Sequence, residues 1–308
     1  HMIFLDNNST TPLDKKVIES MMPYINETYG NPHSIHHTVG HDARDALENS
    51  RNIISDIVNI DPSSIIFTSG ATESNNLFIK GAALRDVKNG KKKKKIFCSS
   101  IEHKCVLDAC KSCEGLGYES HLIPVNSDGK IDLRWLENRI DNETLLVSVM
   151  TVNNETGLRS NVEDINQLCK SNNVLFHSDI AQALIGENLN LGDLNFDGAS
   201  VSGHKIHGPK GVGLLICNND PDILLEPILH GGLQEQNVRS GTTPVFLAVG
   251  IANALRILYE DHTKNKNYIL SLKEEFVGEI QKNKNLKINF HSDNSHPGLL
   301  NISLEGDI

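Results

Sequence analysis

The 308-residue sequence has no long apolar run, no internal repeat and few cysteines. No apolar stretch approaches the roughly 20 residues that span a membrane, and we expect neither a membrane anchor nor a secretory signal. Six cysteines in a chain of this length do not form a disulfide framework, so a reducing compartment is expected: the cytoplasm, or the mitochondrial matrix in a eukaryote. The formal net charge of −10 argues against nucleic acid as the main partner.

The sequence does contain an ordinary share of hydrophobic residues, 38%, in short apolar strands that alternate with amphipathic helices. Strand-like runs occur at residues 65–67, 95–98, 144–150 and 174–176. Strands that are apolar on both faces and separated by helices indicate an α/β fold, with a mostly parallel sheet covered by helices on both faces. A sheet of this kind binds ligands at the carboxyl ends of its strands.

The pattern changes after Pro244. Two helical segments and two strand-like runs follow, at residues 245–259, 268–281, 286–290 and 299–304. We expect them to begin a second, smaller α+β domain, with the Lys/Asn-rich stretch 264–267 as a break between the helices. Because two strands make a poor domain, we expect the natural protein to continue beyond residue 308.

The most informative motif is the segment 202–211, Ser-Gly-His-Lys-Ile-His-Gly-Pro-Lys-Gly, which lies between two short apolar strands. It places Lys205 among small residues on a loop between buried strands. Burial makes a lysine costly as a cation and useful as a neutral amine, the form that attacks a carbonyl cofactor. The alternative interpretation is a solvated lysine in a Gly/Pro turn.

A second polar segment, 68–73, joins the strand 65–67 to a helix. Small residues such as Ala71 and Thr72 let the backbone approach a ligand, and free N–H groups at a helix start favour a phosphate. The alternative is an ordinary helix cap provided by Ser or Thr.

Further polar side chains follow other predicted strands. Asp179, with Gln182 three residues on, could pair with a protonated ring nitrogen, and His103 could stack on a flat ring or transfer protons. The alternatives are a helix cap, a structural histidine and, for the segment around Asn154, a simple turn. Taken together with Lys205 and the phosphate segment, these are the parts of a pyridoxal phosphate site.

At this level of detail the chain resembles the cysteine desulfurases, members of the class-V aminotransferase family, and more closely their housekeeping iron–sulfur branch. The motifs that carry the resemblance run in order along the chain, at residues 4–12, 29–32, 67–75, 102–104, 152–157, 202–205 and 239–242. The resemblance implies fold type I, with a seven-stranded sheet in a large domain (residues 14–253) and a small domain (residues 1–13 and 254–308). It also implies a homodimer.

The resemblance assigns a role to each candidate residue. Lys205 would bind the cofactor covalently, Asp179 would pair with its ring nitrogen, and His103 would stack on the ring and act in catalysis. The remaining contacts would come from Gln182 to the phenolic oxygen, from Asn154 to cofactor and substrate, from Ala71, Thr72, Ser202 and His204 to the phosphate, and from Thr242 to the phosphate in the neighbouring subunit.

The implied reaction takes sulfur from L-cysteine, gives alanine and an enzyme persulfide, and supplies an iron–sulfur scaffold protein. The family's catalytic cysteine lies downstream of the strand matched by residues 301–304, and none of the six cysteines matches it. We therefore expect these 308 residues alone to release little or no sulfide. The alternatives are another class-V activity, a lyase or aminotransferase, or a silent cofactor-binding interaction platform.

Overall fold

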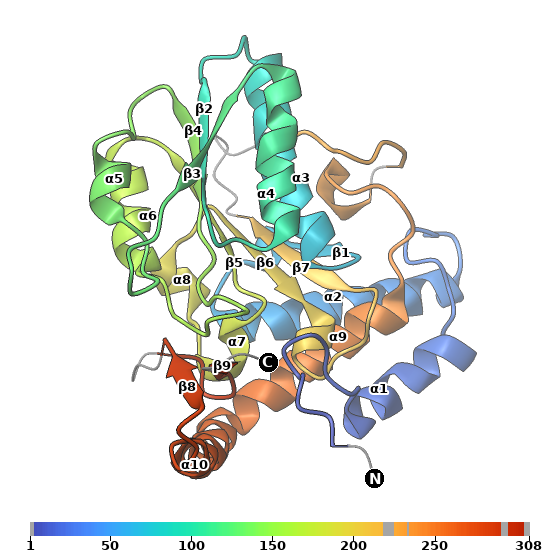
Figure 1. The fold of residues 1–308 in the computed structure, drawn as a ribbon. Helices are drawn as coiled ribbons and strands as arrows, with labels where there is room; N and C mark the ends of the chain where they lie inside the picture. Colours follow the sequence, from blue (N-terminus) through green and yellow to red (C-terminus); the bar gives the residue numbers. More distant parts are fainter. Residues whose placement is uncertain (1–2, 218–224, 233, 291–294, 305–308) are drawn as a thin grey trace.

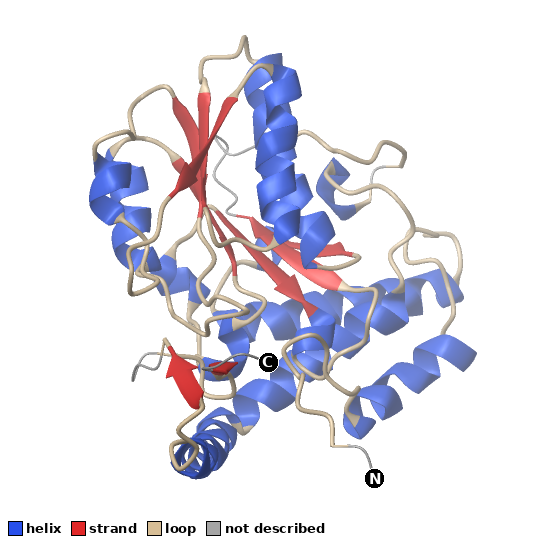
Figure 2. Cartoon of the chain, viewed as in Figure 1, coloured by secondary structure: helices blue, strands red, loops and turns tan. Residues whose placement is uncertain are grey.

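The computed structural model describes residues 3–217, 225–232, 234–290 and 295–304. Figure 2 shows a layered arrangement in which helices flank a central twisted sheet. The sheet contains seven strands: β1 (Ile65–Thr68), β2 (Lys95–Ser99), β3 (Glu119–Ile123), β4 (Thr144–Ser148), β5 (Leu175–Asp179), β6 (Gly198–Ser202) and β7 (Gly213–Cys217). The expected α/β fold with a seven-stranded sheet is therefore confirmed.

The strand order is β1-β7-β6-β5-β4-β2-β3. Strands β3, β2, β4, β5 and β6 pair in parallel, whereas β7 is antiparallel to both of its neighbours, β6 and β1. The mostly parallel sheet was predicted, but the reversed strand was not. Because the five parallel strands run the same way, the segments that follow them meet at one edge of the sheet.

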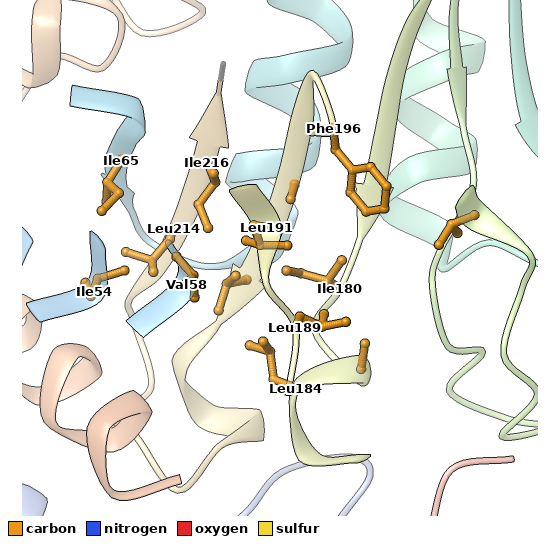
Figure 3. Packing of buried hydrophobic residues seen from close by; sticks show 14 of the residues in the cluster. Ile54, Val58, Ile65, Ile180, Leu184, Leu189, Leu191, Phe196, Leu214 and Ile216 are labelled. Carbon is orange, nitrogen blue, oxygen red and sulfur yellow. The ribbon is translucent and has the colours of Figure 1, made fainter. Parts of the chain in front are cut away.

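Strand side chains alternate between two apolar cores, one on each face of the sheet. In β1, Ile65 and Phe67 join one core while Ile66 joins the other, and in β7 Leu214 and Leu215 divide in the same way. Figure 3 shows part of the first core, in which Leu214 of β7 lies near Ile54 of a neighbouring helix. The sheet is thus apolar on both faces, as the sequence indicated.

Helices cover both faces of the sheet (Figure 1). The helices of the described residues are α1 (Lys15–Asn26), α2 (Thr38–Val58), α3 (Ala71–Lys88), α4 (Lys104–Ser112), α5 (Leu133–Glu137), α6 (Val162–Ser171), α7 (Ala183–Gly186), α8 (Leu191–Leu194), α9 (Val245–Glu260) and α10 (His262–Ile280), with the short 3₁₀ turns η1 (Pro62–Ser64), η2 (Cys113–Leu116), η3 (Gly203–Lys205) and η4 (Glu235–Asn237). Helices α3 and α4 pack on one face, and α2, α6 and α9 contribute to the core of the other. In the part of the chain that the structure describes, no helix is long and apolar enough to cross a membrane.

The C-terminal part differs from the sequence prediction at one point. The expected break at residues 264–267 is wrong, because this stretch lies inside α10 and the break falls at Asp261, between α9 and α10. Only His262 and Ile280 of α10 are buried, so most of its polar side chains can face solvent without interrupting the helix. The remaining strands, β8 (Leu286–Asn289) and β9 (Asn301–Leu304), form a separate antiparallel pair, as predicted in outline.

The division into two domains stays a prediction. Its boundary at residues 253 and 254 lies within α9, and the predicted small domain includes residues 1–2, 291–294 and 305–308, which lie outside the described residues.

Candidate active site

A cavity of about 890 Å³ lies where the parallel strands end. Nine of the ten candidate residues line it, from five separate segments of the chain: Ala71, Thr72, His103, Asn154, Asp179, Gln182, Ser202, His204 and Lys205. Thr242 is exposed and is not among the lining residues. The fold therefore brings together residues that are far apart in the sequence, such as Ala71 and Lys205, which are separated by 134 positions.

Lys205 ends the η3 turn, directly after β6. Its ammonium donates to the carbonyl oxygens of Asn8 and, at 3.0 Å, of Ser9. Burial lowers the pKa of Lys205, although the carboxylates of Asp179 and Asp6 act in the opposite direction. The half-buried setting that the sequence suggested is present, and it favours the neutral amine more than water does.

Hydrogen bonds from the N-terminal segment hold the η3 turn that carries Lys205. The backbone N–H and the hydroxyl of Thr11 both donate to the carbonyl oxygen of His204, at 3.0 and 2.9 Å. The imidazole Nδ1 of His204 lies 3.0 Å from the hydroxyl of Thr10. Sequence reasoning gave no role to Asn8, Thr10 or Thr11, because an irregular polar segment carries no periodicity that would place it in space.

Asp179 ends β5 and is buried at the cavity. Its carboxylate accepts from the side-chain amide of Asn75 at 2.8 Å and from the backbone N–H of Ala181 at 3.0 Å. Burial raises the pKa of Asp179, and the hydrogen bonds and the charges of His103 and Lys205 oppose this shift. A buried carboxylate gains most from a nearby cation, such as a protonated ring nitrogen. Asn75 is a site residue that the sequence analysis missed.

Gln182 is also buried beside the cavity. Its side-chain N–H donates to the carbonyl of Asn8 at 3.1 Å, and its oxygen Oε1 has no partner among the described residues. Buried polar atoms rarely stay unsatisfied, so this amide is available to a polar ligand.

The start of α3 faces the same cavity. The residue before the helix, Gly70, makes no side-chain cap, and a Cβ added there would meet no atom within 4 Å. The first N–H groups of α3 therefore adjoin open space, as an anion-binding helix start requires. Ser202 and His204 line the cavity as well, and burial lowers the pKa of His204.

His103 precedes α4 and caps it, because its Nδ1 accepts the backbone N–H of Cys105 at 3.3 Å. The cap is a structural role, which was the alternative interpretation for His103, and the ring also lines the cavity. Its stacking on a cofactor ring and its part in catalysis stay predictions. Cys105 lines the cavity beside it and was not predicted. Among the described residues, no group of three or more His, Cys, Asp and Glu side chains is arranged to hold a metal ion.

The arrangement suits a ligand with three features: a carbonyl for Lys205, a basic ring nitrogen for Asp179 and an anionic group for the start of α3. Known proteins are similar to this chain along nearly its whole length. The family model described as "Aminotransferase class-V" matches residues 3–307. The chain is 44% identical over 305 residues to a cysteine desulfurase of Rickettsia prowazekii, covering 99% of this chain and 74% of that protein.

Two solved structures are similar throughout. A structure titled "NIFS-like protein" matches with a TM-score of 0.91 and 36% identity, over 96% of this chain and 80% of that one. A structure titled "SspA in complex with cysteine" matches with a TM-score of 0.85 and 34% identity, over 99% of this chain and 84% of that one. With its fold, its cavity and a family match across nearly its whole length, this chain belongs to the class-V aminotransferase family.

Proposed function

We propose that this protein is a pyridoxal phosphate-dependent cysteine desulfurase. The observation that carries the proposal is the pairing, in one cavity, of the half-buried Lys205 amine with the buried carboxylate of Asp179. The cysteine desulfurase relative and the cysteine-bound structural neighbour support this substrate over those of other class-V enzymes.

The residues present fit the cofactor. The uncapped start of α3 at Ala71 and Thr72 would hold the phosphate, and the unpartnered amide oxygen of Gln182 leaves that side chain free to reorganise toward the ring. When bound, pyridoxal phosphate supplies an electron sink for charge that develops at the α-carbon of an amino acid. Ser202 and His204 would complete the phosphate contacts, and Asn154 would face cofactor and substrate.

The chain's own residues would perform the remaining tasks. Lys205, whose pKa is lowered by burial, holds a lone pair more readily than a solvated lysine and can attack a carbonyl or accept a proton. Asp179 would hold a proton at a neighbouring ring nitrogen through its negative charge. His103, at the mouth of α4, would stack on the ring and carry a proton at Nε2, because Nδ1 is already an acceptor.

The net reaction breaks the carbon–sulfur bond of cysteine and forms a sulfur–sulfur bond with a thiolate. The freed carbon takes the bonding electron pair and a proton, which gives alanine, while the sulfur is oxidised to the persulfide level. A thiolate is needed because a neutral thiol is a poor nucleophile.

We further propose a homodimer in which exposed Thr242 reaches the phosphate in the neighbouring subunit. An iron–sulfur scaffold protein would accept the sulfur. None of the six cysteines, which all lie in the described part of the chain, forms a disulfide, and this suits a reducing compartment such as the cytoplasm or the mitochondrial matrix.

The test is covalent capture of the cofactor. The purified protein should be yellow with pyridoxal phosphate, and borohydride should fix the cofactor to Lys205, as peptide mass analysis would show. Lys205→Ala should prevent fixation, whereas Lys210→Ala, at a second lysine of the same cavity, should not. Added L-cysteine should change the visible spectrum. Fixation at another lysine, or a spectral change with other amino acids but not with cysteine, would refute the proposal.

A further inference from the structure

An ion pair stands beside the proposed phosphate site. Glu73 lies in the first turn of α3, and its carboxylate oxygens are 2.8 and 3.4 Å from Nε and Nη2 of Arg239. Both side chains are mostly buried, with 12% and 17% exposed. The same carboxylate also accepts the backbone N–H of Ser69 at 2.7 Å.

The charges that line the cavity make this pair important. Four carboxylates line it but only two lysines do: Asp6, Glu73, Glu155 and Asp179, against Lys205 and Lys210. Glu73 is ionised, because its contacts with Arg239 and Ser69 lower its pKa in spite of burial. An unpaired carboxylate at that position would repel an anionic ligand at the start of α3.

We propose that Arg239 is a positioning residue for the phosphate site. It holds the Glu73 carboxylate toward the loop that carries Arg239, and its positive charge offsets the negative charge that would otherwise repel the cofactor's phosphate. The inference rests on the proposed function, because it assumes that the start of α3 binds the phosphate. It gives Arg239, which does not line the cavity, a role in cofactor affinity.

The structure also explains why a carboxylate stands there at all. By accepting the N–H of Ser69, Glu73 closes the turn that leads into α3, and a negative charge in the first turn of a helix is favourable. Glu73 therefore stabilises the turn, but its negative charge would weaken the binding of an anionic ligand at the start of α3. Arg239 resolves this conflict without removing the hydrogen bond.

The loop that carries Arg239 is itself anchored. Glu235, four residues earlier, is buried and accepts from Arg51 at 2.9 Å and from the backbone N–H of Phe67 in β1 at 2.8 Å. The loop is thereby tied to the strand that ends next to α3. Arg239 is held in place before any ligand arrives, so little ordering is needed when the phosphate binds.

The test compares two probes, pyridoxal phosphate and pyridoxal, which differ only in the phosphate. The dissociation constant of each is measured by visible absorbance on the cofactor-free protein and on three variants: Arg239→Gln, Glu73→Gln and the double variant. We expect Arg239→Gln to bind pyridoxal phosphate about tenfold more weakly. Pyridoxal binding should not change, and the double variant should regain wild-type affinity because the unpaired charge is gone.

Several outcomes would overturn the inference. They are unchanged pyridoxal phosphate affinity in Arg239→Gln, an equal loss for both probes, or a double variant as weak as Arg239→Gln. Should Arg239→Gln fail to fold, Glu73→Gln decides alone: it should bind pyridoxal phosphate at least as tightly as wild type, and weaker binding would refute the role. A wild-type protein that binds neither probe would instead refute the proposed function.

Discussion

The thiol of Cys105 lies 2.9 Å from Nδ1 of His103, and the backbone N–H of Cys105 donates to the same nitrogen at 3.3 Å. A ring nitrogen that accepts an N–H bond carries no proton, so neutral His103 holds its proton on Nε2. Burial raises the pKa of Cys105, which keeps the sulfur as a donating thiol at neutral pH. The side-chain amide of Asn75 donates to this sulfur at 3.2 Å and to Asp179 at 2.8 Å, which links the histidine to the buried carboxylate.

This relationship predicts the tautomer of His103 and how to disturb it. Nitrogen chemical shifts of the imidazole should show the Nε2–H form in wild type and in Cys105→Ser, which keeps a donor. Cys105→Ala loses one of the two donors to Nδ1, so it should show a larger Nδ1–H fraction. Cys110→Ala, at a buried cysteine of the same helix, is the control. A wild-type protein in the Nδ1–H form would contradict the assignment.

The buried pair of Arg51 and Glu235 predicts a large stability effect. The two side chains are 8% and 1% exposed, and Glu235 also holds the N–H of Phe67. Arg51→Met removes the cation and leaves a buried carboxylate without its partner, so we expect the free energy of unfolding to fall by about 3–5 kcal/mol. Urea denaturation at neutral pH measures it.

The matched control for this variant is Arg256→Met, because Arg256 faces Glu260 across 3.9 Å with both side chains more than half exposed. An exposed pair contributes about 1 kcal/mol or less, so this second variant should unfold close to wild type. If both variants lost the same free energy of unfolding, burial of Glu235 would not be the cause of the effect, contrary to the prediction.

Much of the site could be predicted because its residues follow buried strands. Asp179 ends β5 and Lys205 follows β6 by three residues, so the rule that parallel strands end together was enough to bring them to one edge. The contact of Lys205 with Asn8 could not be predicted, since 197 residues separate the two and the N-terminal segment has no periodicity that would place it in space. Asn75 was missed for a different reason: it lies inside α3, where a buried position is normally apolar.

The fold, like the site, could be predicted only in part. Apolar strands that alternate with amphipathic helices predicted the layers, because a strand buried on both faces is a continuous apolar run. It did not predict that β7 runs against its neighbours, since direction does not alter which residues are buried. The polarity of the Lys/Asn-rich stretch predicts a break, but polar side chains are compatible with a helix as exposed to solvent as α10.

Glu102 predicts a pH dependence of stability. Its carboxyl group is buried, accepts from the hydroxyl of Ser99 and the N–H of Met150, both at 2.7 Å, and has one oxygen without a partner among the described residues. Burial raises its pKa from 4.5 to about 8, and the negative charge of Asp179 adds to the shift. The folded protein therefore binds this proton more tightly than the unfolded chain does.

The sign of the effect follows from that preference. The contribution of Glu102 to stability is complete below pH 4.5 and is lost as the pH rises to about 8. Glu102→Gln keeps the shape and removes the titration. The free energy of unfolding of wild type relative to Glu102→Gln should thus fall by a few kcal/mol across this range and level off above it. A constant difference in urea denaturation over the same pH range would refute a raised pKa.

Gly213 predicts a mutation that harms both stability and the site. It pairs with Thr68 of β1 on one side and with Ser202 of β6 on the other. A Cβ at Gly213 would lie 2.5 Å from the carbonyl oxygen of Val201 and 2.6 Å from backbone atoms of Gly70. These are backbone contacts, so relief requires the strands and the start of α3 to move apart.

Gly213→Ala should therefore lower the free energy of unfolding by about 1–3 kcal/mol, as overpacking does. It should also weaken pyridoxal phosphate binding, because the shift moves Gly70 and Ser202 at the proposed phosphate site. Gly278→Ala is the matched control, since a Cβ there meets no atom within 4 Å and alanine favours a helix such as α10 by about 1 kcal/mol. If Gly213→Ala lost stability in urea denaturation but kept full cofactor affinity in an absorbance titration, the start of α3 would have to be independent of β7, contrary to the packing that brings their backbones into contact.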